Sequence, residues 1–248
     1  MPVDGKSGVR IGIAGWAMPA TLSDKSPEAQ SHLEQYSRYF NAVEINSSFY
    51  RPHRRNSYQR WGASVPPWFR FAVKMPKLIT HERRLSGCAE ELSAFLHGVA
   101  GLGEKLGVLL VQLPASVIFD EKVTRAFLEL LSGQTTAKIV CEPRGPSWFV
   151  SAAEDLFARF GVTRVSAHPV PWHCPGKALQ EEDFAYLRLH GAPRIYYSSY
   201  SPEFLNGVCS QIAGDGQGET WCIFDNTAEG AAWPNARSLL ESVSNHCD

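Results

Sequence analysis

The chain has 248 residues, of which 44% are hydrophobic and 20% are charged, and its formal net charge is −1. This length suits one large α/β domain or two small domains, and the near-neutral charge provides no bulk attraction to nucleic acid or membranes. The first ten residues lack the apolar core of a secretory signal, and no apolar run approaches the length of a membrane span. The six cysteines form no CxxC pair. We therefore expect reduced thiols in a cytoplasmic protein with no membrane partner.

Short apolar segments alternate along the chain with amphipathic stretches, which is the pattern of parallel strands joined by helices. The expected strands lie at residues 9–15, 42–46, 69–74, 108–113, 138–142, 162–168, 185–191 and 220–226. The expected helices lie at residues 27–40, 54–63, 88–100, 120–132, 148–160, 201–213 and 234–244. The sixth connection, residues 169–183, contains Pro and Gly residues that argue against a full helix.

This alternation predicts an α/β fold, namely a single (β/α)₈ TIM-barrel-like domain over residues 1–248 with its core at about 9–244. A doubly wound open sheet is the alternative, but helices would cover both of its faces and both should be apolar. Several strands instead have one apolar and one mixed face. Val43 and Ile45, for example, alternate with Glu44 and Asn46. A barrel explains this pattern, because inward residues near the strand ends open onto its mouth.

Polar side chains stand at the carboxyl ends of seven of the eight expected strands, which is the end where TIM barrels place their chemistry. In the last strand Asp225 and Asn226 are adjacent, and the period of two lets only one of them point inward. Trp148 either packs against the start of the next helix or stacks on a substrate. The candidate site residues are Glu44, Asn46, Tyr50, Arg51, Lys74, His81, Gln112, Glu142, Arg144, Trp148, Arg188, His190 and Asn226.

The charges in this set favour an anionic ligand. Lys74, Arg144 and Arg188 outnumber the two carboxylates, Glu44 and Glu142. Buried cations without anions are costly, so they either pair with the two glutamates or await a phosphate, carboxylate or sulfate. Arginine suits this task because its planar fork of donors matches such anions.

Seven motifs together resemble the YecE-like family, in the family's order, from about Ile11 to Ala236. They are "GIAGW", "VEINSSFYR", "FAVKMPKLITHERRL", "LGEKLGVLLVQLP", "EPRGPSW", "YLRLHG" and "FDNTAEGAAWPNA". The resemblance implies a TIM-barrel-like fold with a cleft at the strand ends, and it implies no activity. The family's recurrent polar positions correspond to Glu44, Asn46, Tyr50, Arg51, Lys74, His81, Gln112, Glu142, Arg144, Arg188, His190 and Asn226. The chain departs from the family at Gly145, where a histidine is common, and at Ala17 and Met18, where an aromatic residue often follows Trp16.

We expect an enzyme that acts on a phosphorylated or other anionic small molecule by acid–base chemistry, as a hydrolase or an isomerase. Glu44 and Glu142 form the expected acid–base pair, flanking a water, with the pKa of one carboxyl raised by apolar surroundings. His190 is the alternative proton donor. Lys74, Arg144 and Arg188 would hold the anion, and Gln112 and Asn226 would orient the substrate.

Two other interpretations stay open. The ring of polar residues could bind an anionic effector or a nucleic-acid end without catalysis, with Trp16, Tyr50 and Trp148 as stacking surfaces. It could also be a self-satisfied ion network that stabilises the barrel. No cofactor is predicted and no metal ligands are assigned, although a divalent metal held by Glu and His residues is a further alternative.

Overall fold

The computed structural model describes residues 8–23, 31–170, 184–214 and 218–246. The strands are β1 (Val9–Ile13), β2 (Ala42–Ile45), β3 (Arg70–Lys74), β4 (Leu106–Leu113), β5 (Lys138–Pro143), β6 (Val162–Arg164), β7 (Ser166–His168), β8 (Phe184–Leu189) and β9 (Glu219–Phe224). The α-helices are α1 (His32–Tyr36), α2 (Ser47–Tyr50), α3 (Arg55–Ser64), α4 (Ala89–Val99), α5 (Glu121–Ser132), α6 (Ser151–Arg159), α7 (Pro202–Gly214) and α8 (Ala232–His246). A π-helical turn, η1 (Leu78–Glu82), and two 3₁₀ turns, η2 (Ala100–Lys105) and η3 (Pro146–Trp148), complete the described elements.

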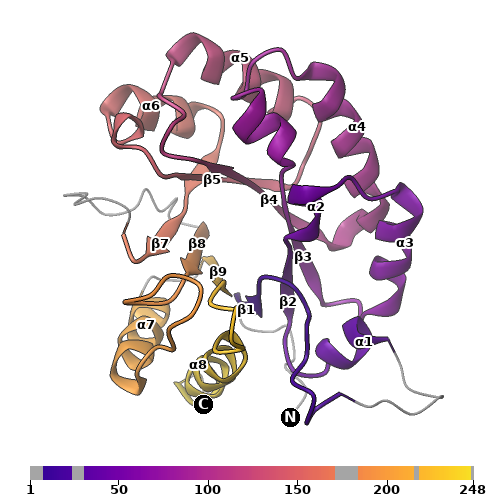
Figure 1. The fold of residues 1–248 in the computed structure, drawn as a ribbon, viewed down its shortest axis with the longest axis vertical. Coiled ribbons are helices and arrows are strands. Elements are labelled where there is room, and N and C mark those ends of the chain that lie inside the picture. Colours follow the sequence, from indigo (N-terminus) through magenta and orange to yellow (C-terminus); the bar gives the residue numbers. More distant parts are fainter. Residues whose placement is uncertain (1–7, 24–30, 171–183, 215–217, 247–248) are drawn as a thin grey trace.

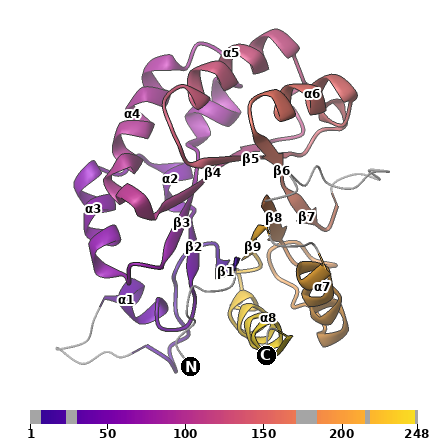
Figure 2. The same ribbon diagram turned by 180° about the vertical axis from the view of Figure 1, so that it is seen from behind.

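The strands lie at the centre of the molecule and the helices surround them (Figure 1). The view from behind shows the same arrangement, with α3 to α6 on one side and α7 and α8 on the other (Figure 2). Each expected helix corresponds to one in the structure. Helix α1 begins at His32, and residues 27–30 of that expected helix lie outside the described residues. Most of the irregular sixth connection, residues 171–183, also lies outside them.

All strand pairings are parallel, but they form two sheets and not one closed barrel. One sheet has the order β2-β3-β4-β5-β6 and the other has the order β1-β9-β8-β7. The prediction of an α/β fold with parallel strands is therefore confirmed. The expected closed eight-stranded ladder is not formed, because its hydrogen bonds are interrupted at two junctions.

The first junction lies between β1 and β2, where side chains replace the backbone ladder. The Asn41 side chain accepts from Ile11 N at 2.8 Å, and the Tyr36 hydroxyl accepts from Ile13 N at 2.9 Å and donates to Ala42 O at 2.9 Å. These contacts satisfy the β1 amides that would otherwise bond to β2. The strands still lie close, since a Cβ atom at Gly12 would clash with the carbonyl of Ala42. One bridge, between Ala14 and Glu44, links the two sheets here.

The second junction lies within the expected strand 162–168, which the structure divides into β6 and β7. Strand β6 pairs with β5, and the amide of Val165 still donates to Cys141 O at 2.9 Å. From Ser166 onward the chain pairs with β8 instead. A single segment thus passes from one sheet to the other, which keeps the carboxyl ends of both sheets on the same side.

Apolar side chains fill both the space between strands and helices and the space between the two sheets. The larger core joins the outer faces of the strands to the helices. The smaller core lies on the inner faces and contains Ala42, Ala72, Val108, Leu110, Val140, Val165, Phe184, Tyr186, Trp221 and Ile223. No described helix is both long and apolar enough to cross a membrane.

Candidate functional site

A polar cluster continues the inner faces of the strands above the smaller apolar core. On β2, β3, β5 and β8, the period of two carries the inward face from buried apolar residues to charged ones near the carboxyl end. Ala42 is followed by Glu44, Ala72 by Lys74, and Val140 by Glu142. On β8, Tyr186 is followed by Arg188 and then by His190, just after the strand. The alternation that the sequence predicted therefore brings these side chains together.

Arg188 is the centre of this cluster and is fully buried. Its Nε and Nη2 atoms donate to the two Glu44 oxygens at 3.0 and 2.7 Å, and the Tyr186 hydroxyl donates to Glu44 at 3.0 Å. The other side of the guanidinium reaches Glu142 Oε2 at 2.5 Å and Asp225 Oδ2 at 3.1 Å. Three carboxylates from three separate segments thus converge on one arginine. Charge-assisted hydrogen bonds of this kind are among the stronger ones in proteins.

His190, also fully buried, links two of these carboxylates. Its Nδ1 lies 3.0 Å from Asp225 Oδ2 and its Nε2 lies 2.9 Å from Glu142 Oε1. Arg144 also contacts Glu142, with its Nη2 at 2.5 Å from the same oxygen, Oε1. An imidazole placed between two carboxylates can donate from both nitrogens only when it is protonated.

The pKa shifts follow from these contacts. Burial alone would raise the pKa of Glu142, but Arg188, His190 and Arg144 outweigh it and hold that pKa well below its usual range. The pKa of Asp225 is likewise lowered, because the charges of Arg188 and His190 outweigh burial. Burial alone would lower the pKa of His190, but its hydrogen bonds to Asp225 and Glu142 raise it. The cluster therefore favours ionised carboxylates around a protonated histidine.

Lys74 lies beside this network, but among the described residues no hydrogen bond or ion pair joins its ammonium to a carboxylate. Its Nζ lies 4.2 Å from the centre of the Phe49 ring, which is a cation–π contact. Burial, followed by the charge of Arg188, lowers its pKa. The His81 ring also contacts Phe49, with centroids 4.9 Å apart, and burial and the nearby Lys74 lower the pKa of His81.

Other expected site residues lie around this cluster. Asn46 donates to Asp225 Oδ1 at 3.4 Å, a long hydrogen bond. Gln112 pairs in register with Glu142 on the neighbouring strand and is partly buried. Tyr50 is 81% exposed and Arg51 is also exposed, so both lie on the surface just after β2.

Two expected site residues are placed elsewhere. Trp148 is only 1% exposed, donates to Val117 O at 2.7 Å and packs on Phe119 and Phe157, so it is part of the core. Asn226 is fully buried, and its amide donates to Ser198 O at 2.9 Å and to Asn235 Oδ1 at 3.0 Å. Both side chains hold the scaffold in place and do not face the cluster.

Sequence reasoning missed the roles of Asp225 and Tyr196. The inward period of β9 runs through Ile223 to Asp225, but both faces of this strand are apolar, so the period alone was ambiguous. Tyr196 has a left-handed backbone, with φ of 71°, and its ring lies edge-on to His190 at 6.0 Å. No pattern in the sequence singles out Tyr196, because a loop position has no period.

These contacts correct two expectations. The guanidinium of Arg188 contacts both Glu44 and Glu142 and so occupies the place expected for a water between them, and the pKa of Glu142 is lowered. The surplus of cations is also smaller than expected. Asp225 is a third carboxylate, and it balances one of the positive charges.

Among the described residues, no group of three or more His, Cys, Asp and Glu side chains is arranged to hold a metal ion.

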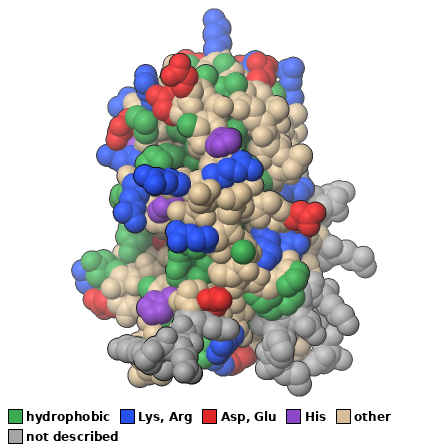
Figure 3. Space-filling view, turned by 90° about the vertical axis from the view of Figure 1, so that its right-hand side faces the viewer, with side chains coloured by type: hydrophobic (Ala, Val, Ile, Leu, Met, Phe, Trp, Pro, Cys, Tyr) green, Lys and Arg blue, Asp and Glu red, His purple; other side chains and the backbone are tan. Residues whose placement is uncertain are grey.

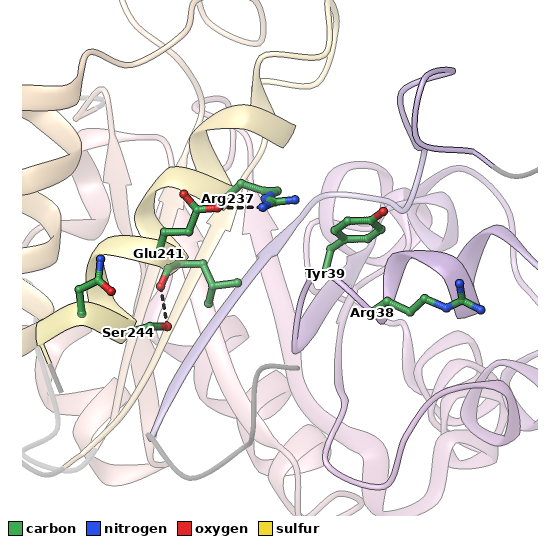
Figure 4. Close-up of a pocket in the computed structure, with 7 residues that line it drawn as sticks. Arg38, Tyr39, Arg237, Glu241 and Ser244 are labelled. Carbon is green, nitrogen blue, oxygen red and sulfur yellow. Dashed lines mark hydrogen bonds and ion pairs between the residues drawn. The ribbon is translucent and has the colours of Figure 1, made fainter. Parts of the chain in front are cut away.

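A pocket of about 580 Å³ lies between α1 and α8, away from the cluster, and Arg38, Tyr39, Arg237, Glu241 and Ser244 line it (Figure 4). Its Arg237 already pairs with Glu241 at 2.8 Å. On the side of the molecule that α3 and α4 occupy, Lys, Arg and His side chains are scattered with Asp and Glu among them (Figure 3). Neither the pocket nor this charged surface contributes a side chain to the polar cluster.

The hydroxyl of Tyr186 offers a direct test of how tightly the cluster is held. Tyr186→Phe removes the donor to Glu44 without removing the ring from the apolar core. We expect a loss of about 1.5–3 kcal/mol in the free energy of unfolding, the range for a hydrogen bond to a charged group. Urea denaturation at pH 7 measures it. A variant as stable as the parent protein would mean that this contact contributes nothing to stability.

Sequence comparison finds relatives whose names assign no activity. The UPF0759 protein YecE of Escherichia coli K12 is 30% identical over 174 residues, which is 66% of this chain and 61% of the relative. The UPF0759 protein YunF of Bacillus subtilis is 28% identical over 57% of this chain and 52% of its own length. The matches therefore span less than two thirds of either relative.

Solved structures show the same fold. The structure of a DUF72 family protein from Enterococcus faecalis V583 superposes with a TM-score of 0.77 at 19% identity, covering 95% of each chain. A DUF72 family protein from Thermotoga maritima MSB8 has a TM-score of 0.74 at 24% identity and covers 95% of this chain and 99% of its own. A xylose isomerase-like TIM barrel/4-hydroxyphenylpyruvate dioxygenase fusion protein reaches 0.55 at 15% identity, over 96% of this chain and 42% of that chain, which supports the TIM-barrel-like fold alone.

The family model described as "Protein of unknown function DUF72" matches residues 10–247. The match covers nearly the whole sequence, as the resemblance of the seven motifs predicted. The chain belongs to this family.

Proposed function

We propose that this protein is an enzyme that acts on a phosphorylated or other anionic small molecule by acid–base chemistry, as a hydrolase or an isomerase. The reaction would take place at the carboxyl ends of the strands, above the buried arginine. The observation that carries the proposal is the position of Lys74, a mostly buried ammonium without a carboxylate partner among the described residues.

The charges of the cluster support an anionic ligand. Arg188, Arg144 and a protonated His190 supply three positive charges, and Glu44, Glu142 and Asp225 supply three negative ones. Lys74 adds a fourth positive charge at the same end of the strands. An anion bound next to it would offset the cost of burying that charge.

The proton chemistry follows from the bridge between Asp225 and Glu142. His190 has its pKa raised, and it contacts Asp225, whose side chain is 8% exposed and so is slightly open to solvent. A proton held by His190 can pass to Asp225 and from there to a ligand, and it can return by the same route in the reverse step. Glu44 and Glu142 keep Arg188 and His190 in position. In this scheme they do not themselves flank the reacting bond.

The test is a thermal-shift screen of inorganic phosphate and phosphorylated metabolites, with and without Mg²⁺. A ligand at 100 times its Kd stabilises the folded state by about 2.7 kcal/mol and therefore raises the Tm. We expect a shift in the parent protein and in Lys77→Met, because Lys77 is exposed and pairs with Glu82. We expect the shift to be lost in Lys74→Met.

Two results would contradict this proposal. Equal shifts in the parent protein and in Lys74→Met would show that Lys74 does not bind the anion, and the proposal would then lose its main support. Binding that favours single-stranded nucleic acid, and weakens steeply as salt rises, would support the non-catalytic alternative.

A further inference from the structure

We infer that Lys74 is an amine nucleophile, and that the substrate is an aldehyde or a ketone that also carries an anionic group. The ε-amine would form an imine with the carbonyl carbon. This inference rests on the proposed function, because it uses the same site, and it names the substrate class and a covalent step.

The geometry fixes the backbone of Lys74, while among the described residues its side-chain nitrogen makes no hydrogen bond. Its backbone carbonyl accepts from the Ser48 hydroxyl at 2.7 Å, and that hydroxyl also contacts Ile45 O at 2.9 Å, so the end of β3 is tied to β2. The side chain is 9% exposed, and its Nζ rests on the Phe49 ring. The Phe49 ring attracts the ammonium, but it forms no conventional hydrogen bond that must break before the amine can react.

Lys105 provides a comparison within the same chain. Its ammonium donates to the carbonyl oxygens of Gly62 at 2.6 Å and of Val65 at 2.5 Å, so two hydrogen bonds hold its nitrogen against the backbone. Lys74 makes no such bond among the described residues. Of these two partly buried lysines, only Lys74 is placed for reaction.

The groups around Lys74 lower the pKa of its ammonium on balance. Burial is the main cause and the charge of Arg188 on β8 is the second, whereas Glu44, Asp225 and Glu142 act in the opposite direction. His81 on η1 faces it as well, and the pKa of that imidazole is itself lowered by burial and by Lys74. The neutral amine, which is the nucleophilic form, is therefore more abundant near neutral pH than for an exposed lysine.

The chemistry balances without an oxidant or a reductant. The amine lone pair forms the C–N bond while the carbonyl π pair moves to oxygen, which takes a proton. The C–O bond then breaks, and the oxygen leaves as water with the two hydrogens that the nitrogen has lost. The resulting C=N bond withdraws electrons from the neighbouring carbon and so assists proton removal there, which suits an isomerase. Once protonated, the imine nitrogen carries the positive charge that Lys74 otherwise supplies, so this end of the strands can still hold the anionic group together with Arg144.

Reductive trapping with glyoxylate tests the inference, because glyoxylate is a small aldehyde that carries a carboxylate. The folded protein at pH 7 is treated with glyoxylate and sodium cyanoborohydride, and peptide mass spectrometry then measures carboxymethylation of each lysine. We expect Lys74 to carry more label than the exposed Lys77, because the lowered pKa of Lys74 leaves a larger fraction of its amine neutral. In Lys74→Arg, labelling of Lys77 should be unchanged. Equal or weaker labelling of Lys74 would overturn the inference.

A parallel thermal-shift measurement with inorganic phosphate, which has no carbonyl group, separates this inference from the proposed function. A phosphate shift with no preference for Lys74 would overturn the imine step and leave the anion site standing. Preferential labelling of Lys74 without any phosphate shift would support the amine nucleophile and count against phosphate as the anionic group.

Discussion

Arg188→Met is expected to lower the free energy of unfolding by about 3–5 kcal/mol at pH 7, the cost of removing one partner from a buried ion pair. The methionine would leave Glu44, Glu142 and Asp225 close together without the guanidinium that they share. Their mutual repulsion and the loss of hydrogen bonds act in the same direction. Domains of this kind are stable by only about 5–15 kcal/mol, so the effect is a large part of the total. Urea denaturation at pH 7 measures the difference.

The same variant should recover part of this loss as the pH falls, because protonated carboxyls no longer repel one another. Arg237→Met is the matched control. Arg237 pairs with Glu241 at 2.8 Å on the surface of α8, and we expect its loss to cost less than about 1 kcal/mol. An Arg188→Met protein within about 1 kcal/mol of the parent protein at pH 7 would show that the cluster does not stabilise the fold.

The stability of the parent protein is expected to be greatest between about pH 5 and pH 6.5. The folded-state pKa values of Glu142 and Asp225 lie below their ordinary values of 4.5 and 3.8, so their contribution is present above those values and is lost as the pH falls. The folded-state pKa of His190 lies above 6.5, so its contribution is present below that value and is lost as the pH rises through the raised pKa. Each unit of displacement is worth about 1.4 kcal/mol.

Two variants test which residues cause the loss of stability at acid pH and above pH 6.5. Glu142→Gln should be less stable than the parent protein at pH 6 and should lose less further stability between pH 5 and pH 3. His190→Gln should flatten the decline above pH 6.5. Urea titrations across this range measure both slopes. An acid decline of the same size in Glu142→Gln and in the parent protein would mean that other carboxyls cause it.

Local patterns were sufficient to predict the helices, the parallel strands and much of the polar cluster. Side chains alternate between the two faces of a strand, so the neighbouring apolar residues show which positions point inward. This alternation alone placed Glu44, Lys74, Glu142 and Arg188 on the inward face. Their shared location at the carboxyl ends followed from parallel connectivity. These features need only a few consecutive residues and the regular geometry of the strand.

What depended on contacts between distant segments could not be predicted in this way. Asn41 and Tyr36 occupy the backbone groups of β1, and this separates the strands into two sheets. Asp225, and not Asn226, reaches Arg188, although parity alone allowed either. The sequence by itself determined which side chains face inward, because that is a local property of each strand. Only the tertiary structure decided which of them neutralise one another, since pairing depends on distances between segments that no local period encodes.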